Sequence, residues 1–276
     1  MEIVKNIEDI DKLKENKIIG NIKLVGNSQI KFNGKDNVLY VDKQFTLINT
    51  VIDFFNSNGC FYVGQVNSFK GDVQIGPDSF MYFGSGFVSS VGNGLIVKCD
   101  ERKNIIIGNY LLCSYNNEIR VTDGHLMYDL ETGKRINQSK SIFMGDNVWL
   151  ANNVTINKGC MIGSGTTIGN NAVVAGKRCD SHTVWVGNPA KKIRENVFIS
   201  QKSPIGYTQK ELDEAENIPA DIQPYKFDEN TVNFYKLEQD VLSNESALKR
   251  SEFLHKFHIE TSKYHNRFYV GKEVYN

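Results

Sequence analysis

The sequence predicts a parallel β-helix, a solenoid of short strands stacked coil upon coil. An aliphatic residue recurs every six positions over residues 144–191, and a small or β-branched residue follows it four positions later. Glycine, asparagine and other polar residues fill the positions between them. A six-residue period suits a repeat in which each unit is one short strand and one turn. On an α-helix the same period would leave no continuous apolar stripe.

The repeat units can be written out from Met144. They read MGDNVW, LANNVT, INKGCM, IGSGTT, IGNNAV, VAGKRC, DSHTVW and VGNPAK. The first position is aliphatic in every unit except the one that begins with Asp180, and the fifth is small or β-branched except at Arg178. We expect these two positions to face inward and the sixth, which includes Trp149, to face outward, because side chains alternate along a strand.

The repeat extends upstream and is interrupted once. Units begin at Ile75 and Ile107, but 25 positions separate Ile119 from Met144, so about 19 residues remain after one further unit. We expect residues 126–143 to leave the solenoid as an extruded loop. Long loops in compact repeat proteins are more often functional than not.

Three segments follow from these patterns. Residues 1–19 form an N-terminal cap, residues 20–194 form the β-helix, and residues 195–276 form a separate, smaller helical extension. Within this extension, TQKELDEAE with Thr208 as its cap, TVNFYKLEQDVL and ALKRSEFLHKF carry helical patterns.

Composition narrows the function classes. Lys plus Arg and Asp plus Glu both number 32, so no overall field draws the protein to nucleic acid or to an anionic membrane. The N-terminus lacks the apolar core of a signal peptide, and the most apolar stretch, TLINTVIDFF, contains Asp53, so we expect no membrane span. Five scattered cysteines without a C-x-x-C spacing predict reduced, buried thiols and a cytoplasmic location.

The segment 144–194, which ends in VGNPAKKIR, resembles the hexapeptide-repeat acyltransferases. VTDGHLMYD followed by MGDNVW resembles the galactoside and maltose acetyltransferases and, more closely, the O-acetyltransferases of bacterial capsules and sialic acids. The resemblance covers residues 20–194. It implies a left-handed β-helix, acetyl-CoA as co-substrate, no metal, and a homotrimer with active sites between subunits.

His125 and Trp149 are the catalytic candidates. Acyl transfer from a thioester to a hydroxyl needs a base, and an imidazole with a pKa near 6.5 suits that task. His125 stands where the loop departs, which would place it at a coil edge, although a capping histidine would occupy the same place. The resemblance implies a tryptophan beside the active site at Trp149, where an indole can stack on a ligand. Direct transfer fits the sequence better than an acyl-enzyme formed on a cysteine, because Cys113 and Cys160 fall at inward positions of the repeat.

The cofactor candidates are small and basic residues. Small side chains permit close approach of a pantetheine arm, and cations bind phosphates. We assign the arm to Ala151, Gly163, Gly169 and Ala175, and the phosphates to Lys177, Arg178, Lys191 and Lys192. The alternative to phosphate binding is that these basic residues form a charged surface exposed to solvent. His182 is expected to be structural, and the histidines after residue 250 form no metal pattern with the solenoid.

The acceptor candidates are Asn93, Asp129 and Arg135. Asn93 aligns roughly with an asparagine that binds the acceptor in galactoside acetyltransferases. The loop residues Asp129 and Arg135 can contact sugar hydroxyls, and Arg135 could grip a carboxylate if the acceptor is acidic.

The leading hypothesis is an acetyl-CoA-dependent O-acetyltransferase acting on a sugar hydroxyl of a bacterial capsular polysaccharide or its precursor. An N-acetyltransferase acting on an amino-sugar nucleotide and a non-enzymatic β-helix interaction module remain alternatives. A zinc carbonic anhydrase on this fold would need about three histidine ligands. The predicted β-helix offers only His125 and His182.

Overall fold

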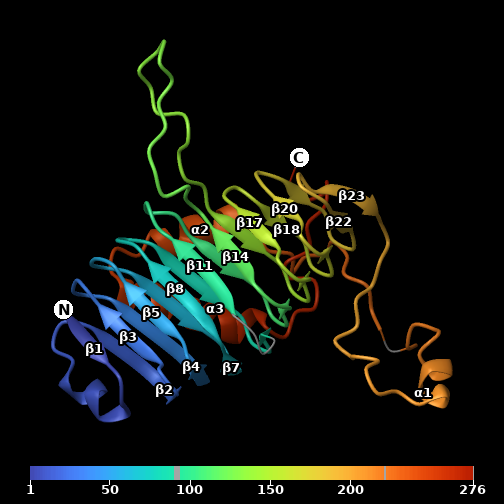
Figure 1. The fold of residues 1–276 in the computed structure, drawn as a ribbon, viewed down its shortest axis with the longest axis horizontal. Coiled ribbons are helices and arrows are strands. Elements are labelled where there is room, and N and C mark those ends of the chain that lie inside the picture. Colours follow the sequence, from blue (N-terminus) through green and yellow to red (C-terminus); the bar gives the residue numbers. More distant parts are fainter. Residues whose placement is uncertain (90–93, 221, 276) are drawn as a thin grey trace.

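The computed structural model describes residues 1–89, 94–220 and 222–275. It is a parallel β-helix with three walls, whose strands lie side by side from one end of the solenoid to the other (Figure 1). The expected fold class is confirmed. We name the walls A, B and C in the order in which the chain visits them, and each corner by the two walls that it joins.

Every described strand belongs to one of these walls. Wall A contains β1 (Glu2–Val4), β3 (Gln29–Phe32), β5 (Val51–Phe54), β8 (Gly71–Ile75), β11 (Leu95–Cys99), β14 (Asn117–Arg120), β17 (Thr155–Asn157) and β20 (Val173–Val174). Wall B contains β2 (Lys17–Val25), β4 (Val38–Ile48), β6 (Cys60–Val63), β9 (Phe80–Phe83), β12 (Ile105–Ile107), β15 (Ile142–Met144), β18 (Met161–Ile162) and β21 (Arg178–Cys179), with β7 (Val66–Phe69) beside β4. Wall C contains β10 (Val88–Ser89), β13 (Leu112–Cys113), β16 (Trp149–Leu150), β19 (Thr167–Ile168), β22 (Val184–Val186) and β23 (Lys191–Arg194).

Inward aliphatic side chains form the core. Side chains at the first position of the repeat lie fully buried in six successive units, which make up two coils: Met144, Leu150, Ile156, Ile162, Ile168 and Val174. Each aliphatic side chain that is fully buried contributes about 1.5–3 kcal/mol to folding. All five cysteines are free and buried, as expected from their positions.

The repeat loses one residue near its end. Cys179 pairs with Ile162 and Trp185 pairs with Ile168, 17 positions apart, whereas Ile156 and Val174 are 18 apart. Asp180 and Val186 therefore do not occupy the inward first position of the repeat, which an uninterrupted count in sixes from Met144 would assign to them. The shorter coil also places Arg178 on the outside of the wall, which explains why a charged residue is tolerated there.

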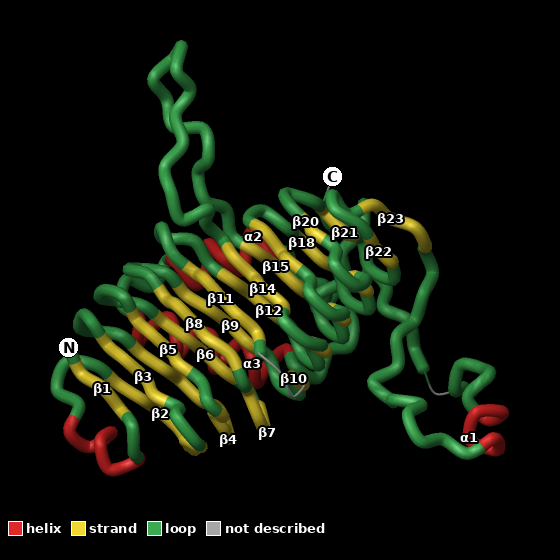
Figure 2. Tube along the Cα trace, in the orientation of Figure 1, coloured by secondary structure: helices red, strands yellow, loops and turns green. Residues whose placement is uncertain are grey.

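The extruded loop has the expected length. Ile119 pairs with Ile156, 37 positions later, which is one 18-residue coil plus 19 residues. The loop comprises residues 121–141, between β14 and β15, and projects from the A–B corner (Figure 2). Its expected end at residue 143 is wrong by two residues, because Ile142 and Phe143 belong to β15 and are buried.

The ends of the chain differ from the expected segments. β2 begins at Lys17, so the boundary expected at residue 20 falls inside a strand, and β1 pairs with β3. A 3-10 helix, η1 (Ile7–Lys12), links β1 to β2. The three helical patterns correspond to α1 (Gln209–Glu214), α2 (Phe234–Leu242) and α3 (Ala247–Thr261), and the Thr208 side chain caps α1.

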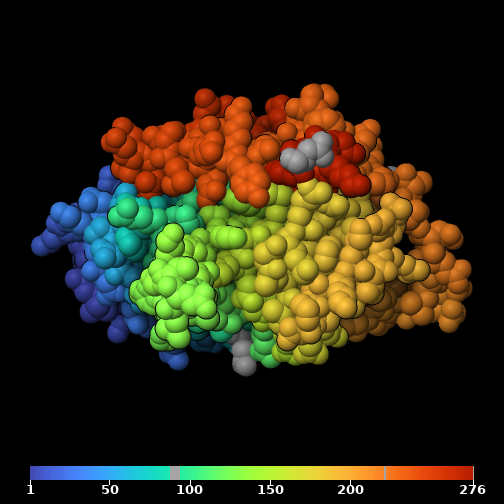
Figure 3. Space-filling model, turned by 90° about the horizontal axis from the view of Figure 1, so that it is seen from above, coloured from blue at the N-terminus to red at the C-terminus, as the bar shows by residue number. Residues whose placement is uncertain are grey.

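The C-terminal extension is not a separate unit. Side chains that face outward from wall B form an apolar ladder of Tyr40, Tyr62, Tyr82, Ile106, Phe143 and Met161. They share one core with Phe234, Leu237, Leu254 and Phe268 of the extension. Figure 3 shows the extension, in orange to red, lying along one side of the solenoid. Without this cover the aromatic ladder would be exposed to water.

A network of buried hydrogen bonds and one ion pair attaches the extension to the solenoid at wall B. Arg267 is fully buried, and its Nε and Nη2 donate to the Asp146 carboxylate at 3.1 and 3.0 Å. Its Nη1 donates to the Tyr82 hydroxyl, 3.3 Å away, and the hydroxyl lies 2.7 Å from Nδ1 of His258. Burial and the nearby Arg267 lower the pKa of His258 to about 4. A neutral ring can accept from Tyr82 and donate through Nε2 to Ser85.

Replacing Arg267 with Met would leave Asp146 charged and unpaired inside the protein. We expect this variant to lower the free energy of unfolding in urea by roughly 3–5 kcal/mol. The double variant Asp146→Asn/Arg267→Met removes both charges, and we expect it to be more stable than the single variant. An unchanged free energy of unfolding for Arg267→Met would mean that the ion pair does not hold the extension in place.

Candidate active site

Asn137 organises the base of the extruded loop. Its side chain is largely buried, and its Nδ2 donates to the backbone oxygen of His125 at 2.7 Å and to Asp123 at 3.0 Å. Its Oδ1 accepts from the backbone nitrogen of Met127 at 3.0 Å. One side chain therefore holds both strands of the loop base together. The backbone of His125 is fixed at the A–B corner as a result.

A second clamp ties the loop to the next coil. Lys158 pairs with Asp123 and donates to the backbone oxygen of Asn137 at 3.0 Å. Hydrogen bonds from Lys158 and Asn137 hold the pKa of Asp123 below its usual value. The carboxylate is therefore occupied by these partners. No pattern in the sequence points to Lys158, because its partner Asp123 lies 35 positions away.

The His125 side chain is exposed at this corner. None of the interactions found among residues 1–89, 94–220 and 222–275 involves its imidazole. An exposed imidazole on a fixed backbone is available to a ligand or to another protein chain. The placement at a coil edge matches the sequence expectation.

The two expected acceptor residues of the loop interact within the chain. The Asp129 carboxylate accepts from the backbone nitrogens of Glu131 and Thr132 at 3.1 and 2.7 Å and stabilises the turn at the loop tip. Arg135 pairs with Glu101 at 2.7 Å. Both side chains therefore have structural partners. Asn93, the third expected acceptor residue, lies outside the described residues.

Trp149 lies on wall C. It is half-buried, and its indole nitrogen donates to the Ser114 hydroxyl at 3.3 Å. It belongs to an outward ladder that runs Leu112, Trp149, Thr167, Val184 in adjacent strands. In a three-sided solenoid wall C lies opposite the A–B corner. A single chain therefore does not bring His125 and Trp149 together.

Two of the four small residues lie next to Trp149. Ala151 follows it at the C–A corner, and Gly169 occupies the same corner one coil later, where its backbone nitrogen donates to Trp185. Ala175 is exposed at the A–B corner. Gly163 is buried at the B–C corner, where a Cβ would lie 2.5 Å from the Ser181 hydroxyl. A single chain therefore does not bring all four into one groove, because the solenoid turns between them.

The basic residues divide in the same way. Lys191 and Lys192 are exposed on β23, which pairs with β22 at the end of wall C. Lys192 also pairs with Glu195. Arg178 lies on wall B, where it pairs with Asp180 at 3.1 Å and donates to the backbone oxygen of Tyr275. Lys177 precedes it at the A–B corner. The expected single cluster is therefore two groups on different walls.

The remaining histidines have structural or peripheral positions. His182 accepts from the backbone nitrogen of Tyr225 at 2.7 Å and contacts the Val197 oxygen through Nδ1, so the structural role expected for it is confirmed. Within the described part of the chain, no three His, Cys, Asp or Glu side chains gather in a way that could hold a metal ion. No helix in that part is long and apolar enough to cross a membrane.

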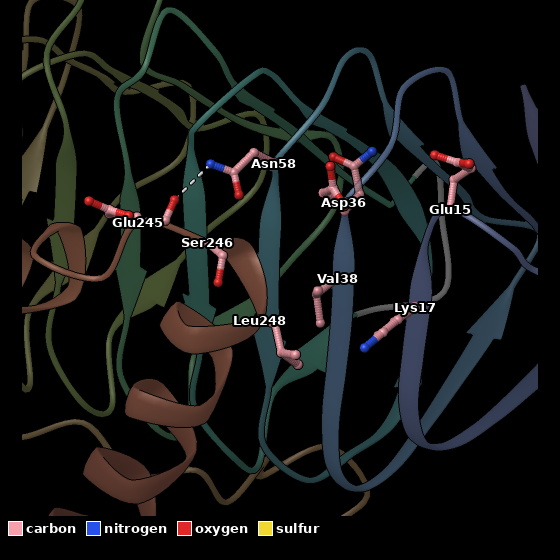
Figure 4. Close-up of a pocket in the computed structure, with 9 residues that line it drawn as sticks. Glu15, Lys17, Asp36, Val38, Asn58, Glu245, Ser246 and Leu248 are labelled. Carbon is pink, nitrogen blue, oxygen red and sulfur yellow. Dashed lines mark hydrogen bonds between the residues drawn. The ribbon is translucent and has the colours of Figure 1, made fainter.

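A cavity of about 500 Å³ lies far from the loop, between the N-terminal strands and the start of α3 (Figure 4). Glu15 and Asp36 line it together with Lys17. Asn58 donates to the backbone oxygen of Glu245 at 3.0 Å and accepts from the backbone nitrogen of Ala247 at 2.6 Å. These bonds attach α3 to the solenoid. We therefore regard the cavity as part of that junction.

The repeat and a larger part of the chain both resemble known proteins. Residues 141–176 match the family model described as bacterial transferase hexapeptide, six repeats. The polysialic acid O-acetyltransferase of Neisseria meningitidis is 29% identical over 135 residues, which cover 46% of this chain and 59% of that protein. The match thus spans somewhat more than half of the curated relative.

Solved structures extend the likeness beyond the repeat. The polySia-specific acetyltransferase NeuO has a TM-score of 0.59 and 28% identity, with 73% of this chain and 95% of that chain covered. The polysialic acid O-acetyltransferase OatWY has a TM-score of 0.50 and 24% identity, with 72% and 97% covered, and shows the shared fold. The chain is therefore similar to hexapeptide-repeat transferases, and among them to the polysialic acid O-acetyltransferases.

Proposed function

We propose that the protein is an acetyl-CoA-dependent O-acetyltransferase that acts on a sugar hydroxyl of a bacterial surface polysaccharide or its precursor, with His125 as general base. The observation that carries the proposal is an exposed histidine at the base of the extruded loop, in a chain related to polysialic acid O-acetyltransferases. An amine acceptor would need the same base. The relatives at 28–29% identity are O-acetyltransferases by name, which favours the hydroxyl.

Wall C offers a surface suited to acetyl-CoA. Ala151 and Gly169 leave room beside Trp149 for an extended arm, because their side chains are small or absent. Lys191 lies opposite Val186 in the strand pairing, so Lys191 and Lys192 can neutralise phosphates at the end of the same wall. Three strand spacings, about 14 Å, separate Trp149 from these lysines.

A second subunit would supply the base. The A–B corner carries His125, Ala175 and Lys177, whereas Trp149 lies on wall C with Ala151 and Gly169 beside it.

The three walls differ in the polarity of their outward side chains. Wall A presents polar side chains such as Lys98 and Arg120, and the extension covers wall B. Among the residues that the structure describes, no helix shares an apolar core with the ladder of Leu112, Trp149 and Val184 on wall C. A homotrimer that places wall C against a neighbour's A–B corner would bury this ladder and complete the site.

The proposed reaction is a direct transfer. The neutral imidazole of His125 takes the proton of the sugar hydroxyl as the oxygen attacks the thioester carbonyl, and returns it to the departing sulfur. Transfer through a cysteine is disfavoured, because burial raises the pKa of Cys113 to about 12 and also raises that of Cys160. A buried thiol of this kind is not a ready nucleophile.

Replacing His125 with Ala should lower kcat by a factor of about 10² to 10⁴, because the general base is lost. We expect acetyl-CoA binding, measured by calorimetry, to stay unchanged, since the cofactor surface lies on another wall. His255→Ala, on α3, serves as the control for removal of a histidine outside the site. Retention of more than about a tenth of wild-type turnover in His125→Ala would refute the assignment.

Asn137 should act by positioning His125. We expect Asn137→Ala to lower kcat by roughly ten- to a hundredfold, because small displacements of a reacting group are costly. The KM for acetyl-CoA should stay near the wild-type value, and amide hydrogen exchange at Met127 should accelerate. Gln138→Ala, which alters the neighbouring exposed amide, is the matched control. Faster exchange at Met127 with unchanged kcat would show that the loop base does not position the histidine.

A further inference from the structure

A groove runs along the A–B corner between wall B and α2. It consists of two adjoining cavities of about 430 Å³ each, which share Gly159, Met161 and Tyr235. Ser139, Lys140 and Ser141 line one of them, and these residues are the return segment of the extruded loop. Figure 3 looks down onto the extruded loop, in light green, with the C-terminal extension in orange to red beside the solenoid. The groove therefore begins at the base of the loop that carries His125.

The shape of the groove depends on two glycines and one aromatic ring. Gly159 and Gly176 have φ values of 74° and 57°, a conformation that disfavours other residues, and a Cβ on Gly159 would lie 3.6 Å from the Cα of Gly176. Both line the groove without side chains. Tyr235 is 56% exposed, and the rings of Phe143 and Tyr275 meet its ring nearly at right angles, with centroids 5.5 and 5.9 Å away. The ring is thus held as a rigid platform.

The lining of the groove contains an excess of positive charge. Arg102, Lys103 and Lys140 lie at one end and Arg178 at the other. Asp78 and Asp180 pair with the two arginines, and the carboxylate of Glu238 accepts from Asn104 and Ser141. Across the described residues no carboxylate pairs with Lys103 or Lys140. These two ammonium groups remain available to an anionic ligand.

We propose that this groove is an extended subsite that holds a carboxylate-bearing glycan chain while one of its sugars is acetylated. The proposal rests on the proposed function and names its substrate class as a polyanionic polymer. The lysines can pair with carboxylates of successive sugars, and a sugar ring can pack on the face of Tyr235. The cofactor phosphates are a weaker fit, because Trp149 and the small residues suited to the pantetheine arm lie on wall C.

The test compares the KM values for a long and a short acceptor in a variant whose groove lysines are replaced by glutamates. We expect Lys103→Glu/Lys140→Glu to raise the KM for a long polymer of sialic acid by about five- to tenfold. The KM values for a sialic acid dimer and for acetyl-CoA should stay unchanged. Lys210→Glu/Lys256→Glu, on α1 and α3, changes the net charge equally outside the groove and should behave like the wild type. Raising the salt concentration should weaken the wild-type preference for the polymer.

Direct binding separates this inference from the proposed function. Fluorescence anisotropy of labelled sialic acid polymer, without acetyl-CoA and with neutral dextran as a control, should show binding that the groove variant loses. That result would support the groove even if the wild type acetylated none of the acceptors, in which case only the proposed function would fail. Equal polymer binding by the groove variant and the wild type would overturn the inference. An increase in the KM for acetyl-CoA in the groove variant would also overturn it, because the groove would then hold the cofactor.

Discussion

The register of the parallel strands is the constraint on which the rest of the structure depends. Each inward side chain lies above an inward side chain of the previous coil, as Ile156 does above Ile119 and Val174 above Ile156. Because side chains alternate along a strand, this register also aligns the outward residues into ladders. A single register thus sets the core and the chemical character of each wall. The extruded loop can leave and return without disturbing either, since β15 resumes the stack beside β12.

The three walls have different neighbours because their ladders differ. The aromatic ladder of wall B requires a cover, and the C-terminal extension provides it through a shared apolar core and the buried Arg267–Asp146 pair. Wall A is polar and can face water. Wall C carries the ladder that includes Trp149, and no helix in the described part of the extension shares an apolar core with it. The proposed catalytic residues are divided between wall C and the A–B corner, and our proposal of an active site shared between subunits follows from this arrangement.

Patterns within the repeat predicted the fold well, and contacts distant in sequence were not predictable. The six-residue period identified the solenoid and the length of the loop because it records local strand pairing. It did not reveal that the coil ending at Cys179 is one residue short, since its turn residues resemble the others. The burial of Gly163 and the separation of Arg178 from Lys191 depend on which corner each residue occupies. The groove at Tyr235 combines a repeat coil with a helix that lies more than 50 positions further along the chain, and no sequence period connects them.

In the proposed trimer, His125 and Trp149 act from different subunits. His125→Ala and Trp149→Ala, each of low activity alone, should be co-expressed and purified as mixed oligomers. In a random trimer about one interface in four pairs an intact histidine with an intact tryptophan, so we expect the mixture to recover about a quarter of wild-type activity. Activity no higher than that of the separate variants, in oligomers shown by mass spectrometry to contain both chains, would contradict the shared site.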